Sequence, residues 1–239
     1  MNIALVGYGT MGKIVEEVVS EENKCFVVGR DFSSLFDIKE HIDCIIDFSS
    51  PSLLDMIVSY ASLHKTPCVI GTTGHSFNQE KKIEELSKKV PLIKSANFCL
   101  GITLVNKLLK DIVPYLSNFF DMEIKEIHHN KKLDAPSGTA VKTAAMMAEN
   151  NENFTTNNCA ETETIEGARG ANSYKNIHIH SVRMPGYMAS QEVLFGANGQ
   201  ILSIRHDSTN RECYMPGVLL SIRYVMDKGG FVYGLDNIM

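Results

Sequence analysis

Short apolar runs alternate with helix-like stretches over the first hundred residues. The runs NIALVG, CFVVGR, CIIDFSS, PCVIGTTG and PLIKSANF are apolar at successive positions, which is typical of parallel strands that are buried on both faces. The stretches at 11 to about 22, 52–65 and about 78–89 have the length and spacing of helices. The pattern predicts a Rossmann-type, doubly wound parallel α/β domain over residues 1–100.

The hydrophobic pattern changes after this domain. The segment ITLVNKLLKDIVPYL predicts a helix with an apolar stripe at Leu104, Leu108 and Ile112. The runs FFDMEIKEIHH, NIHIHSVRM, QEVLFGA and GQILSIRHD then alternate apolar and polar positions, as expected of a sheet with one solvated face. We therefore expect an α+β domain with a mixed, open sheet over residues 101–207.

Two further segments complete the predicted organisation. Residues 150–174 are polar and rich in Asn and Thr, and we interpret them as a long loop. Residues from about 208 to 239 contain a last helix, in MPGVLLSIRYVMDK, and we expect them to pack back on the first domain.

Composition and charge limit the classes of protein that this chain can be. With 239 residues and 44% hydrophobic residues, the chain is long enough to bury a core. No apolar run reaches the roughly 18 residues of a membrane-spanning helix, and the N-terminus lacks signal-peptide features, so we expect a cytoplasmic protein. The net charge of −5 and the pI near 5.9 argue against a nucleic-acid partner.

The cysteines are spread along the chain and form no C-x-x-C pair. The sequence therefore indicates neither a zinc ribbon nor a disulfide framework. We interpret the six residues as reduced thiols that lie mostly in the core: Cys25, Cys44, Cys68, Cys99, Cys159 and Cys213.

The segment GYGTMG places three glycines between the first strand and the first helix. In this context Gly7 makes the tight turn, Gly9 lets the backbone approach a pyrophosphate, and Gly12 lets the helix pack close to the strand. The pyrophosphate then lies at the free N–H groups where the helix begins. An ordinary glycine-rich turn is the alternative, but the strand-to-helix context favours a dinucleotide site.

The end of the second predicted strand bears on the choice between NAD and NADP. An NAD enzyme usually carries an acidic residue there for the ribose 2′-hydroxyl, but this chain has Gly29, Arg30 and Asp31. Arg30 would attract a 2′-phosphate, so the sequence favours NADPH, whereas Asp31 keeps NADH open. Arg30 as a plain surface residue is the third interpretation.

Two more strand ends, GTTG at 71–74 and SANF at 95–98, are rich in small and hydrogen-bonding residues. Ligands of open α/β sheets lie beyond the carboxyl ends of the strands, so we expect both segments to line the nicotinamide. The segment DFSSP at 47–51 could play the same part, or Asp47 could cap the helix that follows.

The segment EIHHNKKLDAPSGTA crowds proton carriers and anion ligands into fifteen positions, 126–140. His128 continues the inward-facing positions of the predicted strand, and His129 points the other way. The run PSGTAVKTAAMMAE then predicts a helix that Ser137 caps, and its first N–H groups form a second anion site. Together with Lys132, these groups could hold a small dicarboxylate and supply it with protons.

The same residues also allow less specific interpretations. Lys131 and Lys132 could form an exposed turn, and the whole segment could be a solvated basic patch. A zinc site is not indicated, because neither an H-E-x-x-H motif nor a third ligand at metal spacing follows. His178 and His180 have the pattern of ordinary strand residues.

This segment closely resembles the signature of the dihydrodipicolinate reductase family, also called 4-hydroxy-tetrahydrodipicolinate reductase. The resemblance covers nearly the whole chain and includes GYGTMG, IIDFSSP, GTTG, SANFCLGI, SVRMPG and the closing MPGVLLSIRYVMDKGGFVYGLDNIM. It implies an NAD(P)H-dependent oxidoreductase that reduces 4-hydroxy-tetrahydrodipicolinate, a small cyclic dicarboxylate, to tetrahydrodipicolinate in diaminopimelate and lysine biosynthesis. It also implies a homotetramer that is built through the second, substrate-binding domain, with no nucleic-acid or membrane partner.

The resemblance further implies roles for individual residues. His128 would be a proton donor or acceptor, and Lys132 would be the proton donor. The substrate carboxylates would be bound by His129, Gly138 and Thr139. The cofactor, NADPH or NADH, would be bound by Gly7, Tyr8, Gly9, Thr10, Met11, Gly12, Arg30, Gly71, Thr72, Thr73, Ser95, Ala96, Asn97 and Phe98.

Three features depart from the family pattern. Many relatives have an acidic residue in place of Gly29, one more residue in the phosphate loop, and Gly-Glu-His where this chain has Ala189, Ser190 and Gln191. Two rival functions stay open: another two-domain NAD(P)-dependent dehydrogenase of a small carboxylate, and a non-catalytic NAD(P)-sensing protein. Neither of these rivals gives the crowded His and Lys residues a purpose.

Overall fold

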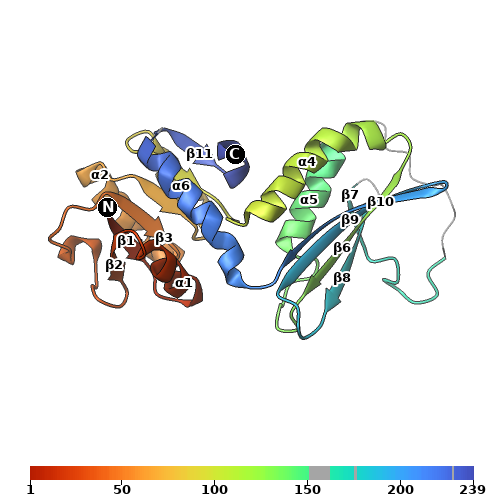
Figure 1. The fold of residues 1–239 in the computed structure, drawn as a ribbon, viewed down its shortest axis with the longest axis horizontal. Coiled ribbons are helices and arrows are strands. Elements are labelled where there is room, and N and C mark those ends of the chain that lie inside the picture. Colours follow the sequence, from red (N-terminus) through yellow and green to blue (C-terminus); the bar gives the residue numbers. More distant parts are fainter. Residues whose placement is uncertain (151–161, 175–176, 228) are drawn as a thin grey trace. The chain divides into compact units, whose positions relative to one another are not determined.

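The computed structural model describes residues 1–150, 162–174, 177–227 and 229–239. The chain divides into two compact units (Figure 1). The first unit consists of Met1–Leu100 and Arg211–Met239, and the second unit consists of Gly101–Asn210. Within the described residues, no helix is long and apolar enough to cross a membrane.

The first unit is built on a six-stranded sheet in the order β11-β5-β4-β3-β1-β2. All of its strand pairings are parallel, which confirms the predicted Rossmann-type sheet. Apart from Asn2 and Asp47, the residues of the central strands are apolar and buried, as expected of strands that are covered on both faces. The strands are β1 (Asn2–Val6), β2 (Lys24–Val28), β3 (Cys44–Asp47), β4 (Cys68–Ile70), β5 (Leu92–Lys94) and β11 (Phe231–Tyr233).

Helices cover both faces of this sheet. On one face, α1 (Thr10–Val19) and α6 (Met215–Asp227) share a core with Ile3 and Leu5 of β1. On the other face, α2 (Leu54–His64) and α3 (Phe77–Ser87) share a core with Ala4 and Val6 of the same strand. The short 3-10 helices are η1 (Leu35–Asp37), η2 (Pro51–Leu53), η3 (Arg211–Tyr214) and η4 (Leu235–Ile238).

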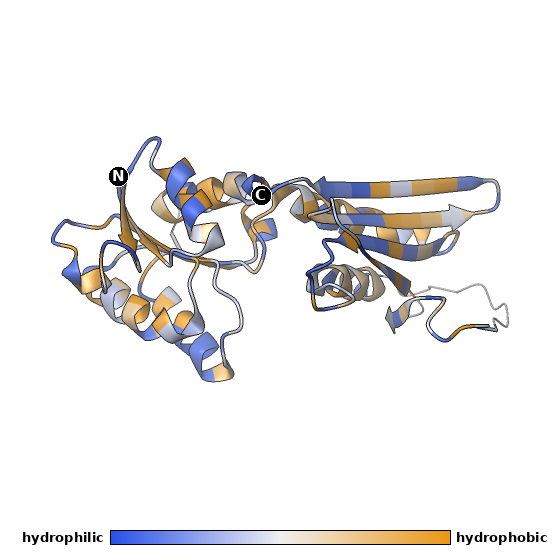
Figure 2. Ribbon diagram, turned by 90° about the horizontal axis from the view of Figure 1, so that it is seen from below, coloured by the Kyte–Doolittle hydropathy of each residue, from blue (hydrophilic) through white to orange (hydrophobic). Residues whose placement is uncertain are grey.

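The second unit contains a five-stranded mixed sheet in the order β10-β9-β6-β8-β7. Strands β6 and β8 are parallel, and the other neighbours are antiparallel, as the prediction of a mixed sheet requires. Figure 2 shows hydrophobic and hydrophilic positions mixed along these strands. The strands are β6 (Asp121–His128), β7 (Ala171–Tyr174), β8 (Ile177–Arg183), β9 (Ala189–Ala197) and β10 (Gln200–Ser208).

Two helices, α4 (Leu100–Leu116) and α5 (Gly138–Glu149), pack on one face of the mixed sheet. Leu109 of α4 and Ala144 of α5 share a core with Ile124 of β6 and Phe195 of β9. On β6, the residues that face these helices are every second one, so the inward-facing alternation that the sequence predicts for this strand is confirmed.

Two sequence-based expectations are wrong. The apolar stripe of α4 is not the predicted one, because Leu104 and Leu108 are 53% and 46% exposed whereas Leu109 and Val113 are fully buried. This helix is apolar on several sides, so the period alone did not decide which side packs. Within the predicted loop of residues 150–174, the last four residues form β7 along β8; residues 151–161 lie outside the described residues.

The thiols agree with the prediction as far as they are described. Cys44, Cys68 and Cys99 are buried, Cys25 and Cys213 are half-buried, and none of these five described cysteines is in a disulfide. Burial raises the pKa of the Cys44 thiol to about 12, so this group is an inert part of the core. Cys159 lies outside the described residues.

Candidate active site

The glycines of the loop between β1 and α1 differ in what surrounds them. Gly7 has a φ of +98°, and a Cβ there would lie 2.4 Å from the Phe48 carbonyl oxygen. A Cβ on Gly12 would lie 2.2 Å from the Gly7 carbonyl oxygen, whereas a Cβ on Gly9 would meet nothing within 4 Å. Gly7 therefore serves the turn and Gly12 the close packing, while the backbone at Gly9 is open to a ligand.

The N-terminus of α1 is suited to an anion. Gly9 is the N-cap residue of this helix and provides no side-chain hydrogen bond to the first N–H groups. The following residues Thr10 and Met11 begin the helix, and Tyr8 lies half-buried beside them. A pyrophosphate group fits this site, because uncapped N–H groups and the positive end of the helix dipole both favour negative charge.

Arg30 lies beside this loop at the end of β2. Its guanidinium donates to the hydroxyl of Tyr8 at 2.9 Å and stands 4.6 Å from the centre of the Tyr8 ring. It also forms ion pairs with Asp31 at 2.6 Å and with Glu16 at 2.7 Å. The hydrogen bond from Arg30 lowers the pKa of the Asp31 carboxyl, so this group is a carboxylate at neutral pH and pairs with the arginine.

The loops that follow β3, β4 and β5 contact one another. The rings of Phe48 and Phe98, which follow β3 and β5, lie 5.5 Å apart, and a Cβ on Gly71 after β4 would lie 2.5 Å from the Phe48 ring. Thr72 accepts a hydrogen bond from the backbone N–H of Ser49 at 2.9 Å. The carboxyl ends of these strands thus form one surface, where a ligand of such a sheet binds.

Within this surface, the remaining predicted residues of the first unit have distinct surroundings. Thr73 and Ala96 are exposed, and the hydroxyl of the buried Ser95 donates to the carbonyl oxygen of Asn97 at 2.6 Å. The side chain of Asn97 accepts from the backbone N–H of Cys99 at 2.8 Å. The segment 95–98 is therefore a turn held by its own side chains, with the exposed Ala96 within it.

Asp47 is a buried carboxyl at the end of β3 that joins two of these loops. Burial raises its pKa, and hydrogen bonds from Ser49 and Thr72 partly oppose that rise. Its Oδ1 atom accepts from the backbone N–H of Ser49 at 3.1 Å. Asp47 thus fixes the loop after β3 against the loop after β4, instead of capping the helix that follows.

In the second unit, His128 is the last residue of the central strand β6 and lies on the face that the helices cover. Met122, Ile124 and Glu126 precede it on that face, and the Glu126 side chain is fully buried. One carboxylate oxygen of Glu126 forms a hydrogen bond with Nδ1 of His128. The side chain of His128 retains 15% exposure.

Arg183 completes this arrangement from the neighbouring strand. It is paired with His128 in the parallel register of β6 and β8, and its guanidinium donates to the other oxygen of Glu126 at 2.8 Å. Burial would raise the pKa of Glu126, but hydrogen bonds from His128, Arg183 and Ser181 outweigh it and lower that pKa to about 2. The carboxylate is therefore ionised and accepts from three side chains.

In the loop between β6 and α5, Lys132 and the N-terminus of α5 both contact the carboxylate of Asp134. Nζ of Lys132 lies 2.7 Å from Oδ1 of Asp134, and the backbone N–H of Gly138 also donates to the Asp134 carboxylate. Both contacts lower the pKa of Asp134, the one to Lys132 more strongly. A single carboxylate thus contacts the ammonium group and the start of α5 together.

Two family models match this chain. The family model described as "Dihydrodipicolinate reductase, C-terminus" matches residues 101–239, and the model described as "Dihydrodipicolinate reductase, N-terminus" matches residues 30–98. The chain belongs to the dihydrodipicolinate reductase family.

Individual relatives support this membership over most or nearly all of the chain. The 4-hydroxy-tetrahydrodipicolinate reductase of Listeria monocytogenes serotype 4b is 40% identical over 241 residues, which cover 99% of this chain and 89% of the relative. The protein of the same name from Synechococcus elongatus is 43% identical over 204 residues, or 84% of this chain and 73% of the relative. The solved structure of a dipicolinate-bound dihydrodipicolinate reductase from Paenisporosarcina sp. TG-14 has a TM-score of 0.84 at 35% identity, and the match covers 100% of this chain and 99% of that chain.

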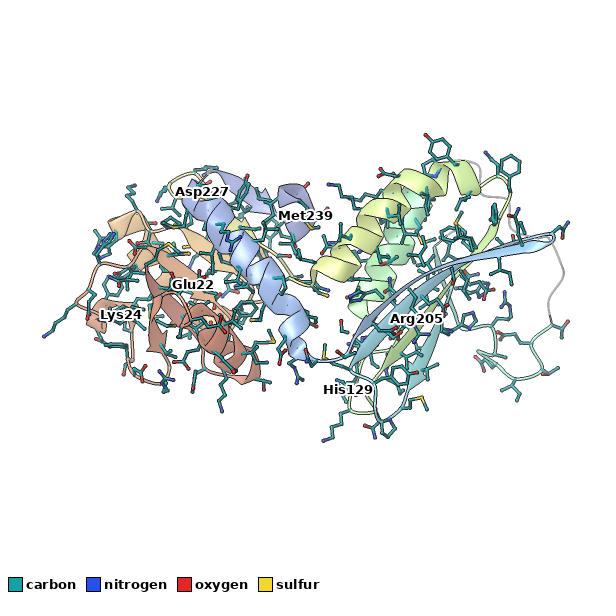
Figure 3. The ribbon with its side chains drawn as sticks, in the orientation of Figure 1. Glu22, Lys24, His129, Arg205, Asp227 and Met239 are labelled. Carbon is teal, nitrogen blue, oxygen red and sulfur yellow. The ribbon has the colours of Figure 1, made fainter. Side chains whose placement is uncertain are left out.

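Other residues of the family signature lie around the same loop. His129, labelled in Figure 3, follows directly after β6 and is half-buried, and its carbonyl oxygen accepts from the backbone N–H of Lys132 at 3.1 Å. Lys131 is exposed, and Thr139 is half-buried in the first turn of α5. Among the described residues, no group of three or more His, Cys, Asp and Glu side chains is placed to hold a metal ion.

Sequence reasoning missed two residues that contact His128 directly or through one another, Glu126 and Arg183. A signal for Glu126 was present, because it occupies an inward-facing position of the strand between Ile124 and His128, where a charge needs a partner. The partner Arg183 is 57 residues away in sequence. Only the register of β6 and β8 brings the two together, and that register cannot be read from the sequence.

Proposed function

We propose that this chain is a 4-hydroxy-tetrahydrodipicolinate reductase, which reduces its substrate to tetrahydrodipicolinate with NADPH or NADH in diaminopimelate and lysine biosynthesis. Family membership supports the activity, and relatives that carry this name align with nearly the whole chain. The single observation that carries the proposal is the convergence of Lys132 and the N-terminus of α5 on one carboxylate, on the loop that follows His128.

The first unit is proposed to bind the nicotinamide cofactor, whose chemistry is the delivery of a hydride to the substrate ring. The open backbone at Gly9 and the uncapped N-terminus of α1 fit its pyrophosphate. The segments 71–73 and 95–98, at the carboxyl ends of β4 and β5, would hold the nicotinamide. Gly7, Tyr8, Thr10, Met11 and Gly12 would complete the phosphate loop.

The contacts of Arg30 favour the use of both cofactors, with NADPH accepted at least as well as NADH. Arg30 is close enough to the phosphate loop to meet a 2′-phosphate, because it contacts Tyr8. Glu16 and Asp31 already neutralise it, however, and an incoming phosphate has to compete with them. Such competition reduces discrimination between the two cofactors.

The substrate carboxylates are proposed to bind at the N-terminus of α5 and at His129. The position of the Asp134 carboxylate supports this assignment, because it demonstrates that a carboxylate can contact Lys132 and Gly138 at once. A substrate carboxylate that enters the same position replaces Asp134 at the N–H of Gly138 and gains the N–H of Thr139. The positive end of the helix dipole favours the exchange.

His128 and Lys132 are proposed to manage the protons of the reaction. The Lys132 ammonium has protons to donate, and its pairing with Asp134 holds it on the loop that follows β6. Nδ1 of His128 is hydrogen-bonded to Glu126, so Nε2 is the ring nitrogen that would exchange a proton with the substrate. A hydride added to the ring requires a balancing proton, which this pair of residues supplies.

The second unit is proposed to form a homotetramer in the cytoplasm. Its sheet carries helices on one face, and Ile201, on the other face at the edge strand β10, is 81% exposed. The helices of the described residues pack on the opposite face, so Ile201 is available for contact with another copy of the chain. Sedimentation analysis should then give four times the chain mass of 26.5 kDa.

A thermal-shift assay with NADPH and dipicolinate separates this function from its rivals. A 4-hydroxy-tetrahydrodipicolinate reductase should be stabilised by each ligand, because each binds the folded state. A dehydrogenase of an unrelated carboxylate, or a non-catalytic NAD(P)-sensing protein, should respond to NADPH and not to dipicolinate. A null response to dipicolinate at saturating concentration contradicts the proposed function.

A further inference from the structure

The buried carboxylate of Glu126 has a specific relation to His128. It lies two residues earlier on the same strand and therefore on the same face, and it meets the ring at Nδ1. The second carboxylate oxygen of Glu126 accepts a hydrogen bond from Arg183, and the Ser181 side chain also donates to the Glu126 carboxylate. Glu126 is fully buried, whereas the His128 side chain is partly exposed. The carboxylate therefore contacts the imidazole ring from the protein interior.

The ionised state of Glu126 determines which tautomer His128 adopts. The pKa of Glu126 is lowered to about 2, so the group is a carboxylate at neutral pH and can only accept hydrogen bonds. Nδ1 of His128 must therefore carry a hydrogen. In the neutral ring this leaves the lone pair on Nε2, which becomes the nitrogen that takes up and returns a proton.

Arg183 connects the same carboxylate to the loop that carries Lys132. Besides Glu126, its guanidinium donates to the backbone carbonyl oxygen of Asp134 at 2.7 Å. The side chain of Asp134 in turn accepts from Lys132. One continuous set of contacts thus runs from His128 through Glu126, Arg183 and Asp134 to Lys132.

We propose that Glu126 and Arg183 are positioning residues of the active site. Glu126 holds His128 in the Nδ1–H tautomer so that Nε2 exchanges the proton, and Arg183 fixes the carboxylate and the Lys132 loop relative to each other. The proposal rests on the proposed function for the identity of the reaction, but the tautomer of His128 can be measured without turnover.

The substitution Glu126→Gln should invert this tautomer. Arg183 is purely a donor, so the amide oxygen of the new side chain has to face it. The amide NH₂ group then points at Nδ1 of His128, which must become an acceptor, and the hydrogen moves to Nε2. A buried ion pair that serves stability alone predicts no such inversion.

The test is ¹⁵N NMR of histidine-labelled protein, with the His128 signals assigned from their loss in His128→Gln. We expect wild-type protein to show the Nδ1–H tautomer in the neutral ring and Glu126→Gln to show Nε2–H. An Nε2–H tautomer in the wild type overturns the proposal even if Glu126→Gln does not fold. An unchanged tautomer in a folded Glu126→Gln protein also overturns it.

A matched control lies on the opposite face of the same strand. Glu123 accepts from His180 at 2.8 Å and from Arg169 at 2.7 Å, so it has the same types of partner as Glu126. The substitution Glu123→Gln removes a comparable ion pair and should leave the tautomer of His128 unchanged. A change in this control as large as in Glu126→Gln contradicts a specific role of Glu126.

Kinetics separate this inference from the proposed function. Glu126→Gln should lower kcat by about a hundredfold, close to the effect of losing a general acid–base group, with little change in KM. Full turnover by Glu126→Gln refutes the positioning role and leaves the proposed function intact. No turnover by the wild type refutes the proposed function, while the NMR result still decides the tautomer.

Discussion

At the scale of single residues, Lys131 and Lys132 are adjacent and have the same charge but different surroundings. Lys131 is exposed, whereas Lys132 has 22% side-chain exposure and contacts Asp134, whose carboxylate also contacts the start of α5. A charge in water is screened, and a charge held in a site acts on the charge that develops in the reaction. The neighbours should therefore differ in their contribution to catalysis.

Substitution of the two proposed proton carriers tests this difference. His128→Gln or Lys132→Ala should lower kcat by about two orders of magnitude or more, and the double variant should be far from additive. Affinity for NADPH, measured by calorimetry, should hardly change. Lys131→Ala is the control and should cost much less. If Lys131→Ala and Lys132→Ala lowered kcat equally, the segment would be a solvated basic patch and Lys132 would not be a proton donor.

The surroundings of Arg30 give a second prediction at this scale. Arg30→Ala should raise KM for NADPH and leave KM for NADH nearly unchanged, because NADH has no 2′-phosphate for Arg30 to contact. A charge-assisted hydrogen bond contributes about 1.5 to 3 kcal/mol, or about ten- to a hundredfold in affinity. Because Glu16 and Asp31 compete with the 2′-phosphate for Arg30, we expect the loss of NADPH affinity to be at the lower end of this range.

A reciprocal variant sharpens the Arg30 test. Glu16→Gln removes one competing carboxylate, so KM for NADPH should fall. Steady-state measurements with both cofactors provide the comparison. Parallel changes for NADPH and NADH in either variant would mean that Arg30 does not contact the 2′-phosphate.

Sequence reasoning at this scale succeeded where a local period determined the outcome. The inward direction of His128 follows from alternation along a strand, and the burial of Glu126 and Ile124 on the same face confirms it. The pairs that Arg183 forms with Glu126 and that Arg30 forms with Glu16 join different elements. Such contacts depend on register and packing, which the local pattern does not contain.

At the scale of elements, the N-terminus of α5 can be tested with little risk to the fold. Gly138 has no unusual φ, and a Cβ there would meet nothing within 4 Å. Gly138→Val should therefore fold but block the approach of the substrate carboxylate. Calorimetry should show dipicolinate binding lost and NADPH binding kept, with Gly138→Ala intermediate. If Gly138→Val bound dipicolinate with undiminished affinity, the N-terminus of α5 would not be part of the substrate-binding site.

The link between β6 and β8 predicts a pH dependence of stability. The pKa of Glu126 is lowered from 4.5 to about 2, so its contribution is complete above about pH 4.5 and is lost as the pH falls toward 2. A shift of this size corresponds to stability on the order of 3 kcal/mol.

Urea unfolding at a series of acidic pH values measures this contribution. The free energy of unfolding of the wild type should fall more steeply between pH 4.5 and 2 than that of Glu126→Gln, which has no carboxylate to protonate. Other carboxylates remain in both proteins and cancel in the comparison. Equal slopes would mean that Glu126 is not ionised in the folded protein.

Most helices and strands were predictable because each has a clear hydrophobic period. The exceptions have physical reasons. The strand β7 is short and polar, with the sequence ANSY, and only its pairing with β8 makes it a strand. The helix α4 is apolar on several sides, so its buried positions Leu109 and Val113 depended on what packs against it.

At the scale of the whole molecule, the two kinds of sheet were predictable because their patterns differ. Strands that are apolar throughout gave the parallel sheet, and alternating strands gave the mixed sheet with helices on one face. The proposed activity needs both units, since the glycine loop lies in one and His128 with Lys132 lies in the other. Neither unit should be active by itself.

The most direct measurement is steady-state oxidation of NADPH and NADH by the full chain with enzymatically generated 4-hydroxy-tetrahydrodipicolinate. The account predicts turnover that depends on this substrate with both cofactors, and inhibition by dipicolinate that competes with the substrate. Binding of NADPH without any substrate-dependent oxidation would contradict it.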